Sequence, residues 1–322
     1  MKLQNITVIG CGRWGTFIAK HLFDLGFSVT LYGRAASARM QELLHERKNA
    51  QFTLPAGITL CTDLKTALQN SDLTVISIGA QNLRALTREM RGAGFAGGTV
   101  LLCMKGLEIG SGKRLSVVAA EEFGPATKVA VWIGPGHVQD FCKGIPNCMV
   151  IDSADEETKQ WLVDALASPL IRFYYGQDLI GNEVGAAAKN VIGIAAGMLD
   201  GLEVSPLKGA LMSRGTREIA RLIQALGGNE LSAYGLCHLG DYEATVFSPH
   251  SHNRGFGEAF VKGEPFKDLA EGYYTVQALV TLADATGVDL PICRTVHAVL
   301  YENAPAKEAL SALFARSLKN EF

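Results

Sequence analysis

Three glycines near the N-terminus, Gly10, Gly12 and Gly15, stand in the spacing G-x-G-x-x-G directly after the apolar run 6–9. The first glycine permits a tight turn, the second lets the backbone approach a pyrophosphate, and the third lets the following helix pack on the strand. The helix N-terminus then offers N–H groups and a positive dipole end to phosphates. We therefore expect a nicotinamide dinucleotide here. The alternative is a turn that merely connects a strand to a helix.

The residues after the second apolar run, 28–32, bear on which dinucleotide is bound. NAD-selective sites usually carry Asp or Glu at this point for the ribose 2′-hydroxyl, but this chain has Gly33-Arg34. An arginine can pair with the 2′-phosphate of NADP. The sequence thus favours NADP, or use of both NAD and NADP. The alternative is that Arg34 stacks on the adenine or faces water.

Lys189 is an unusual charge because its neighbours over several residues on each side are small or apolar. A buried ammonium needs a partner or a lowered pKa. Gly185, Gly193 and Gly197 lie at four-residue steps from it and leave space along that helix face for a ligand or another helix. A lysine beside such a groove can act as a general acid or base. The alternative is a lysine that snorkels to the surface from a tightly packed helix pair.

Four polar residues in the second half, His238, Asp241, His250 and His252, raise the question of a metal site. Their spacing matches no standard zinc site, so we expect no metal. His250 and His252 are expected on a polar loop, where one of them meets the substrate.

The elements that must carry these residues differ between the two halves. Apolar runs without polar alternation are typical of strands buried on both faces of a parallel sheet, and they occur at 6–9, 28–32, 73–78, 100–104, 129–133 and 148–151. Helical patterns such as 16–25 and 83–90 fall between them. This alternation predicts an α/β Rossmann domain with a doubly wound, mostly parallel sheet.

The second half has the pattern of an all-α domain. Its predicted helices are 182–200, 208–226, 269–286, 292–302 and 307–318. We place the boundary near residue 178. The prediction is a dinucleotide-binding domain over 1–178 and a helical substrate-binding and catalytic domain over 179–322.

Composition excludes several classes of protein. The 322 residues are 48% hydrophobic and 19% charged with a net charge of −2, which indicates a globular chain rather than a disordered one. No segment is dominated by Lys and Arg, so no nucleic-acid partner is expected. Seven scattered cysteines suit a reducing compartment, and the apolar stretch 184–199 is too short and polar to span a bilayer. We expect a cytoplasmic protein without an integral membrane segment, acting on a small molecule. The helical half is compatible with a homodimer.

Many short motifs in order give the chain a family resemblance. It resembles the NAD(P)-dependent glycerol-3-phosphate dehydrogenases over essentially its full length. The matching stretches are 10–15, 105–108, 134–135, 180–183, 188–191, 195–201, 239–241, 248–249, 253–254 and 271–272. The resemblance implies a Rossmann domain, a helical substrate domain, and reversible reduction of dihydroxyacetone phosphate to sn-glycerol 3-phosphate, a glycerophospholipid precursor.

The resemblance also implies roles for individual residues. Lys189 is the implied proton donor or acceptor at the carbonyl oxygen, with Asp241 holding it and Lys105 and Asn190 polarising the carbonyl. The implied substrate-binding residues are Lys105, Gly134, Gly136, Ser251, His252 and Asn253. The implied cofactor-binding residues are Gly10, Gly12, Arg13, Trp14, Gly15, Arg34, Lys105, Val138, His252 and Glu271.

Two departures from the family pattern bear on the substrate. Gly136 stands where the family usually has Ser or Thr, which removes a hydroxyl, and His252 replaces an arginine expected near phosphate. A histidine carries only part of an arginine's charge at neutral pH. A first alternative is therefore a reductase of another small hydroxy- or keto-compound, including an unphosphorylated one. A second is a dinucleotide-binding sensor without turnover, which is disfavoured by the joint presence of Lys105, Lys189, Asn190 and Asp241.

Overall fold

The structure is a computed structural model that describes residues 3–315, and the chain divides into two compact units. The first comprises residues up to 105 together with 114–179, and the second comprises 106–113 together with the residues from 180 onward. The sequence prediction places 106–113 in the first domain. In the structure Leu107 is part of the core of the second unit, and Gly112 packs so closely on Leu282 that a Cβ would lie 2.9 Å from it.

The first unit is built on an eight-stranded sheet in the order β3-β2-β1-β4-β5-β6-β7-β8. The strands are β1 Asn5–Ile9, β2 Ser28–Tyr32, β3 Thr59–Cys61, β4 Leu73–Ile76, β5 Gly98–Leu102, β6 Thr127–Ile133, β7 Asn147–Ser153 and β8 Ile171–Tyr175. All neighbouring pairs are parallel except β6 and β7. The six predicted runs all coincide with strands. The short β3 and the edge strand β8 were not predicted.

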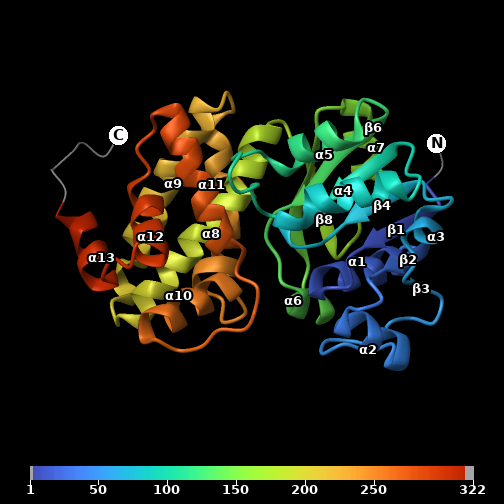
Figure 1. The fold of residues 1–322 in the computed structure, drawn as a ribbon, viewed down its shortest axis with the longest axis horizontal. Helices are drawn as coiled ribbons and strands as arrows, with labels where there is room; N and C mark the ends of the chain where they lie inside the picture. The colour runs from blue at the N-terminus through green and yellow to red at the C-terminus, as the bar shows by residue number, and fades with distance from the viewer. Residues whose placement is uncertain (1–2, 316–322) are drawn as a thin grey trace. The chain divides into compact units, whose positions relative to one another are not determined.

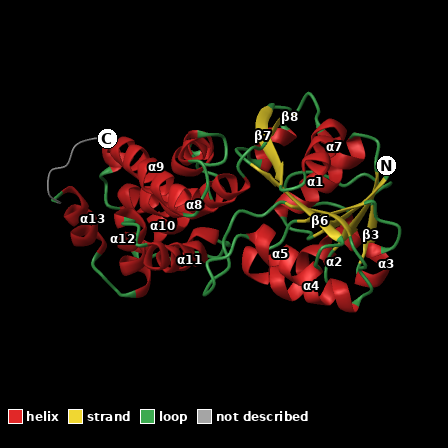
Figure 2. Ribbon diagram, turned by 90° about the horizontal axis from the view of Figure 1, so that it is seen from above, coloured by secondary structure: helices red, strands yellow, loops and turns green. Residues whose placement is uncertain are grey.

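Helices cover both faces of this sheet (Figure 2). They are α1 Arg13–Asp24, α2 Ala38–Glu46, α3 Leu64–Leu68, α4 Leu83–Gly92, α5 Leu115–Phe123, α6 Val138–Cys142 and α7 Glu156–Leu166, with a short 3₁₀ turn η1 at Ala80–Asn82. The strand order reverses between β1 and β4, and open parallel sheets bind ligands at the carboxyl ends of the strands beside such a reversal. The predicted doubly wound, mostly parallel Rossmann fold is confirmed.

The second unit is helical and is organised around one long helix, α8 Leu179–Gly201 (Figure 1). Its other elements are η2 Ser205–Leu207, α9 Lys208–Ala225, η3 Glu230–Tyr234, η4 Leu239–Asp241, the π-helical turn η5 Glu243–Phe247, α10 His252–Lys262, α11 Glu271–Thr286, α12 Pro291–Tyr301 and α13 Ala306–Phe314. Residues 183–199 of α8 are buried. The end of the helix predicted at 307–318 lies outside the described residues. Among those described, no helix is both long and apolar enough to cross a bilayer.

The prediction of a polar loop at His250 and His252 is wrong for His252, which is the first residue of α10. Ser251 caps this helix, because its hydroxyl accepts a hydrogen bond from the Arg254 amide at 3.3 Å. The capping pattern was present in the sequence, but the surrounding Gly, Ser, His and Asn residues resemble a loop in composition.

Candidate functional site

The glycine turn of the first unit has the geometry that its sequence predicts. Gly10 has a φ of +116°, and a Cβ there would lie 2.1 Å from the carbonyl oxygen of Ser77 at the end of β4. A Cβ at Gly15 would lie 2.0 Å from the Gly10 carbonyl oxygen. These contacts bring the start of α1 close to the sheet, so only glycine fits at either position.

The same turn fits the pyrophosphate of a dinucleotide. Gly12 is the N-cap residue of α1, and within the described chain no side chain caps this helix. The positive dipole end of α1 is therefore not covered by a capping side chain, which suits a bound anion. The one heavy atom within 4 Å of a Cβ built at Gly12, among described residues, is an Arg39 guanidinium nitrogen at 3.5 Å. The backbone at Gly12 is thus open to close approach by a ligand.

Two arginines lie near this turn on the side of β2. Arg34 follows the end of β2 and is exposed, and Arg39 lies in α2 with its guanidinium beside Gly12. Arg39 was missed by sequence reasoning, although its place in the first turn of the helix that follows β2 was a usable signal. Trp14 does not stand free at the turn, because its ring packs against Phe17 and Phe141 with centroids 5.4 and 6.0 Å apart. Arg13 begins α1.

Further candidate residues follow the carboxyl ends of β5 and β6. The Lys105 ammonium donates a hydrogen bond to the Gly134 carbonyl oxygen at 2.5 Å. Gly134 and Gly136 have φ values of +128° and +145°, and a Cβ at Gly136 would lie 2.5 Å from the Phe141 ring. Two features therefore favour glycine over a hydroxyl-bearing residue at position 136: the positive φ and the nearby Phe141 ring. Val138 is buried at the start of α6.

Lys189 lies in the middle of α8 and is only 8% exposed, so it does not snorkel to the surface. Its ammonium forms an ion pair with Asp241 at 3.0 Å and donates a hydrogen bond to the Thr245 hydroxyl at 2.7 Å. The Thr245 hydroxyl in turn donates to the Asp241 carbonyl oxygen at 2.7 Å. The partner that the sequence required for a buried ammonium is therefore Asp241, and the three side chains form one network.

Thr245 was also missed by sequence reasoning. It lies four residues after Asp241, so one helical turn brings its hydroxyl to the same lysine. Gly193 makes this approach possible, since a Cβ there would lie 2.7 Å from the Thr245 methyl group. The space along α8 that the glycine spacing predicted is filled by other segments of this unit.

Asn190 and Asn253 extend the polar network to α10 and α11. The Asn253 side-chain amide donates to the Asn190 side-chain oxygen at 3.0 Å, and the Asn253 oxygen accepts from the Gly272 amide at 2.9 Å. A Cβ at Gly272 would lie 2.6 Å from the Asn190 carbonyl oxygen. Glu271, the first residue of α11, is next to this contact. His252 points elsewhere, with its Nδ1 3.3 Å from the Leu269 carbonyl oxygen.

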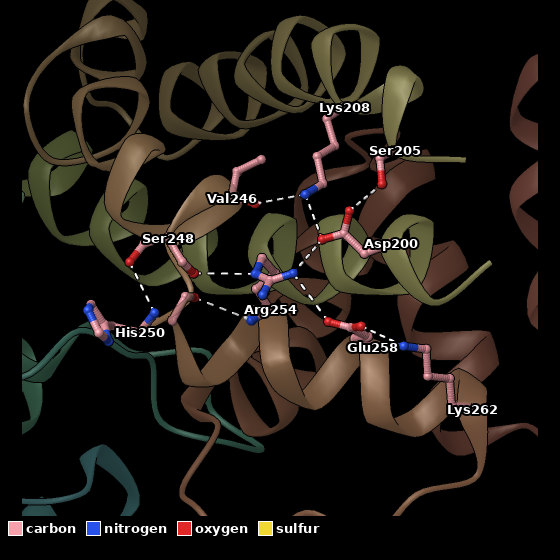
Figure 3. A network of polar contacts seen from close by, with 10 residues as sticks. Asp200, Ser205, Lys208, Val246, Ser248, His250, Arg254, Glu258 and Lys262 are labelled. Atoms are coloured by element: carbon pink, nitrogen blue, oxygen red, sulfur yellow. Dashed lines mark hydrogen bonds and ion pairs between the residues drawn. The ribbon is translucent and has the colours of Figure 1, made fainter. Parts of the chain in front are cut away.

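A second network anchors the segment between Thr245 and α10. Arg254 and Lys208 point toward Asp200 near the end of α8, each with a nitrogen 2.6 Å from the Asp200 carboxylate (Figure 3). Lys208 also donates to the Val246 carbonyl oxygen at 3.2 Å, and Arg254 to the Ser248 carbonyl oxygen at 3.3 Å. These contacts hold the chain that leads from Thr245 to Asn253.

No cluster of three or more His, Cys, Asp or Glu residues among those described has the arrangement of a metal site. The chemistry that the Lys189 network can perform is proton transfer by an ammonium held beside a carboxylate, with amide and hydroxyl groups next to it. Such an arrangement serves a carbonyl or alcohol group whose oxygen gains or loses a proton.

Models of one protein family match both units. The N-terminal model of NAD-dependent glycerol-3-phosphate dehydrogenase matches residues 5–159, and the C-terminal model matches residues 178–311. The chain belongs to this family. The glycine turn falls in the first match, and Lys189, Asp241 and Asn253 fall in the second.

Individual glycerol-3-phosphate dehydrogenases align over the whole chain. Glycerol-3-phosphate dehydrogenase [NAD(P)+] of Prosthecochloris aestuarii is 34% identical, over 98% of this chain and 99% of its own length. The enzyme of the same name from Thermobifida fusca is 36% identical, over 99% of both chains. The crystal structure of glycerol-3-phosphate dehydrogenase from Coxiella burnetii superposes with a TM-score of 0.91 at 28% identity, over 98% of this chain and 99% of that one. Membership makes this chain a dinucleotide-dependent oxidoreductase.

Proposed function

We propose that the protein catalyses the reversible NAD(P)H-dependent reduction of dihydroxyacetone phosphate to sn-glycerol 3-phosphate. The observation that carries the proposal is the buried Lys189–Asp241–Thr245 network in a chain that also has a complete dinucleotide turn. Full-length similarity to enzymes named for this activity supports it. The reaction supplies a precursor of glycerophospholipids.

The residues divide the work of the reaction as follows. When bound, the nicotinamide supplies the hydride to the carbonyl carbon, and in the reverse direction it accepts it. Lys189 donates a proton to the carbonyl oxygen, and Asp241 keeps the ammonium charged and oriented. Asn190, held by Asn253, offers an amide to the hydroxyl groups of the substrate. In the first unit Lys105 supplies a second cation, and the glycine turn holds the pyrophosphate.

The experiment that tests this proposal follows NADPH and NADH absorbance with dihydroxyacetone phosphate and a panel of related carbonyls. The panel contains unphosphorylated dihydroxyacetone, glyceraldehyde 3-phosphate and a branched keto acid. We expect turnover of dihydroxyacetone phosphate at the highest kcat/KM in the panel. No oxidation of NADPH or NADH with the phosphate ester would refute the proposal. No oxidation with any carbonyl of the panel would favour a dinucleotide-binding sensor.

A second candidate is a reductase of a small carbonyl compound that lacks a phosphate. The observation in its favour is the chemistry of two positions, because Gly136 presents no hydroxyl and His252 presents an imidazole where the family resemblance implies a guanidinium. A serine at position 136 would be strained at the φ of +145° and would require the Phe141 ring to shift. Unphosphorylated dihydroxyacetone in the same panel separates the two candidates.

We further propose that NADPH is used at least as well as NADH. Replacing Arg34 by alanine is expected to raise the Kd of NADPH about tenfold, the loss of one charge-assisted contact to the 2′-phosphate, and that of NADH less than about twofold. Titration of NADPH and NADH fluorescence measures both constants. Arg172→Ala, at an exposed arginine on β8 stacked on Tyr174, is the matched control. An unchanged NADPH-to-NADH ratio in Arg34→Ala would remove Arg34 from cofactor selection.

We also propose that the protein forms a homodimer through its helical unit and that it is located in the cytoplasm. Exposed apolar side chains on η3, Leu231 and Tyr234, support a contact between helical units. All seven cysteines are free thiols, which supports a reducing compartment.

A further inference from the structure

His238 is completely buried beside the lysine network, and both of its ring nitrogens are engaged. Its Nδ1 lies 2.9 Å from the carbonyl oxygen of Gly185, and its Nε2 lies 2.8 Å from the hydroxyl of Tyr242. A carbonyl oxygen can only accept, so Nδ1 carries the proton and donates it to Gly185. Nε2 is then unprotonated and accepts from the Tyr242 hydroxyl. The imidazole is therefore neutral, with its orientation fixed from both ends.

The charges around His238 favour this neutral form. The pKa of His238 is lowered to about 4, mainly by burial and also by the nearby Lys189 ammonium, while the Gly185 hydrogen bond and Asp241 act in the opposite direction. The ring therefore keeps one donor and one acceptor throughout the neutral pH range. Since both nitrogens are used within the fold, His238 is not available as a metal ligand or a general base.

The residue bonded by His238 lies one helical turn before the lysine. In α8 the Gly185 carbonyl oxygen also accepts the main-chain N–H of Lys189, four residues on. His238 in turn lies three residues before Asp241, and its amide and the Asp241 amide belong to the same tight turn around η4. The imidazole thus joins the segment that carries Asp241 to the turn of α8 that carries Lys189.

Gly185 is what allows this close approach. A Cβ at position 185 would lie 3.0 Å from the His238 Cβ, which is tighter than ordinary contact. A side chain there would displace the imidazole from the carbonyl that it bonds. The hydrogen bond between His238 and Gly185, which are 53 residues apart, therefore depends on glycine at position 185 as well as on the histidine.

We propose that His238 is a positioning residue that sets the distance between the Asp241 carboxylate and the Lys189 ammonium through its bond to Gly185. This inference rests on the proposed role of Lys189 as proton donor. His238 does not touch the substrate. It affects the reaction by positioning Asp241. The Asp241 carboxylate in turn keeps Lys189 protonated, so that Lys189 can donate a proton to the carbonyl oxygen.

The test compares variants that keep or lose the donor to Gly185. His238→Gln removes that donor, and we expect kcat for reduction to fall on the order of tenfold to a hundredfold through misplacement of the charged pair. The basic limb of the kcat/KM profile should shift by about one unit to lower pH, because an ammonium without its carboxylate neighbour loses its proton more easily. His238→Asn places an amide N–H near the position of Nδ1. Its kcat and the pH of its basic limb should therefore both be close to those of the unmodified protein.

A second variant keeps the test decisive if His238→Gln does not fold. Gly185→Ala retains the histidine at position 238 but displaces its ring from the Gly185 carbonyl oxygen. The basic limb of the kcat/KM profile should therefore shift to lower pH, as in His238→Gln. Thr286→Val is the control, since it removes a half-buried hydroxyl that donates to the Leu282 carbonyl oxygen at the end of α11 in the same unit. It should lower Tm without moving the pH profile.

Two results would overturn the inference. One is a wild-type kcat and basic limb in both His238→Gln and Gly185→Ala, whatever their Tm. The other is an equal shift of the limb in Thr286→Val, which would show a general loosening of the unit. Neither result bears on the proposed function, which instead fails if the unmodified protein oxidises neither NADPH nor NADH with dihydroxyacetone phosphate.

Discussion

Replacing Lys189 by methionine is expected to lower kcat for carbonyl reduction by about a hundred- to ten-thousand-fold, the usual contribution of a positioned general acid. Methionine keeps the apolar stem and removes the ammonium that bonds Asp241 and Thr245. Binding of NADPH, which relies on the glycine turn of the other unit, should stay within about twofold. Steady-state kinetics and a fluorescence titration measure the two quantities on the same preparation.

Lys208 offers a matched control for this substitution. It is a lysine of the same unit with the same 8% exposure, and its partner is likewise an aspartate, Asp200, at 2.6 Å. Lys208→Met removes a buried ion pair but no proposed proton donor, so Tm should fall while kcat changes by less than about tenfold. Turnover of Lys189→Met at the level of Lys208→Met would contradict the assignment of Lys189.

Replacing Gly197 by alanine is expected to destabilise the helical unit by about 3 kcal/mol, the upper end of the range for overpacking. A Cβ at this position would lie 1.9 Å from the Arg254 carbonyl oxygen and 2.8 Å from the Glu258 amide nitrogen, both in the backbone of α10. Backbone cannot rotate out of the way as a side chain does, so α10 must move away from α8. Thermal unfolding should report a Tm lower by roughly 6–12 °C.

The same substitution should also affect turnover. Asn253 lies in α10 and is bonded to Asn190 of α8, so separating the helices breaks that 3.0 Å hydrogen bond. We expect KM for the substrate to rise with the loss of stability. Gly209→Ala is the control, because Gly209 is an exposed residue of α9 where a Cβ would meet nothing within 4 Å. An alanine there should stabilise the helix by about 0.5–1 kcal/mol. A Tm for Gly197→Ala equal to or above that of the parent would refute the packing argument.

The sequence determined those features of this protein whose physical cause is local. The turn at Gly10 needs a positive φ and a close backbone approach, which only a short glycine pattern allows, so the dinucleotide turn could be predicted from the spacing alone. The buried strands could be predicted because parallel strands covered on both faces are continuous apolar runs. The edge strand β8 was missed because its side chains alternate between buried and exposed over only five residues.

Lys189 is an intermediate case. An ammonium among apolar neighbours had to have a partner or a lowered pKa, and this requirement was visible in the sequence. The partner itself was assigned only through family resemblance. Asp241 and Thr245 lie more than 50 residues away, and no local pattern states which distant turn will meet a given face of a helix.

Only the tertiary structure decided how the segments of the helical unit meet. The glycines of α8 left space for either a ligand or another helix, and the structure fills it with His238 at Gly185, Thr245 at Gly193 and the backbone of α10 at Gly197. It also assigns residues 106–113 to the helical unit. Local patterns follow from backbone geometry and side-chain polarity, which act over a few residues. Pairing between distant segments depends on the complementarity of whole surfaces, and that is set only when the chain has folded.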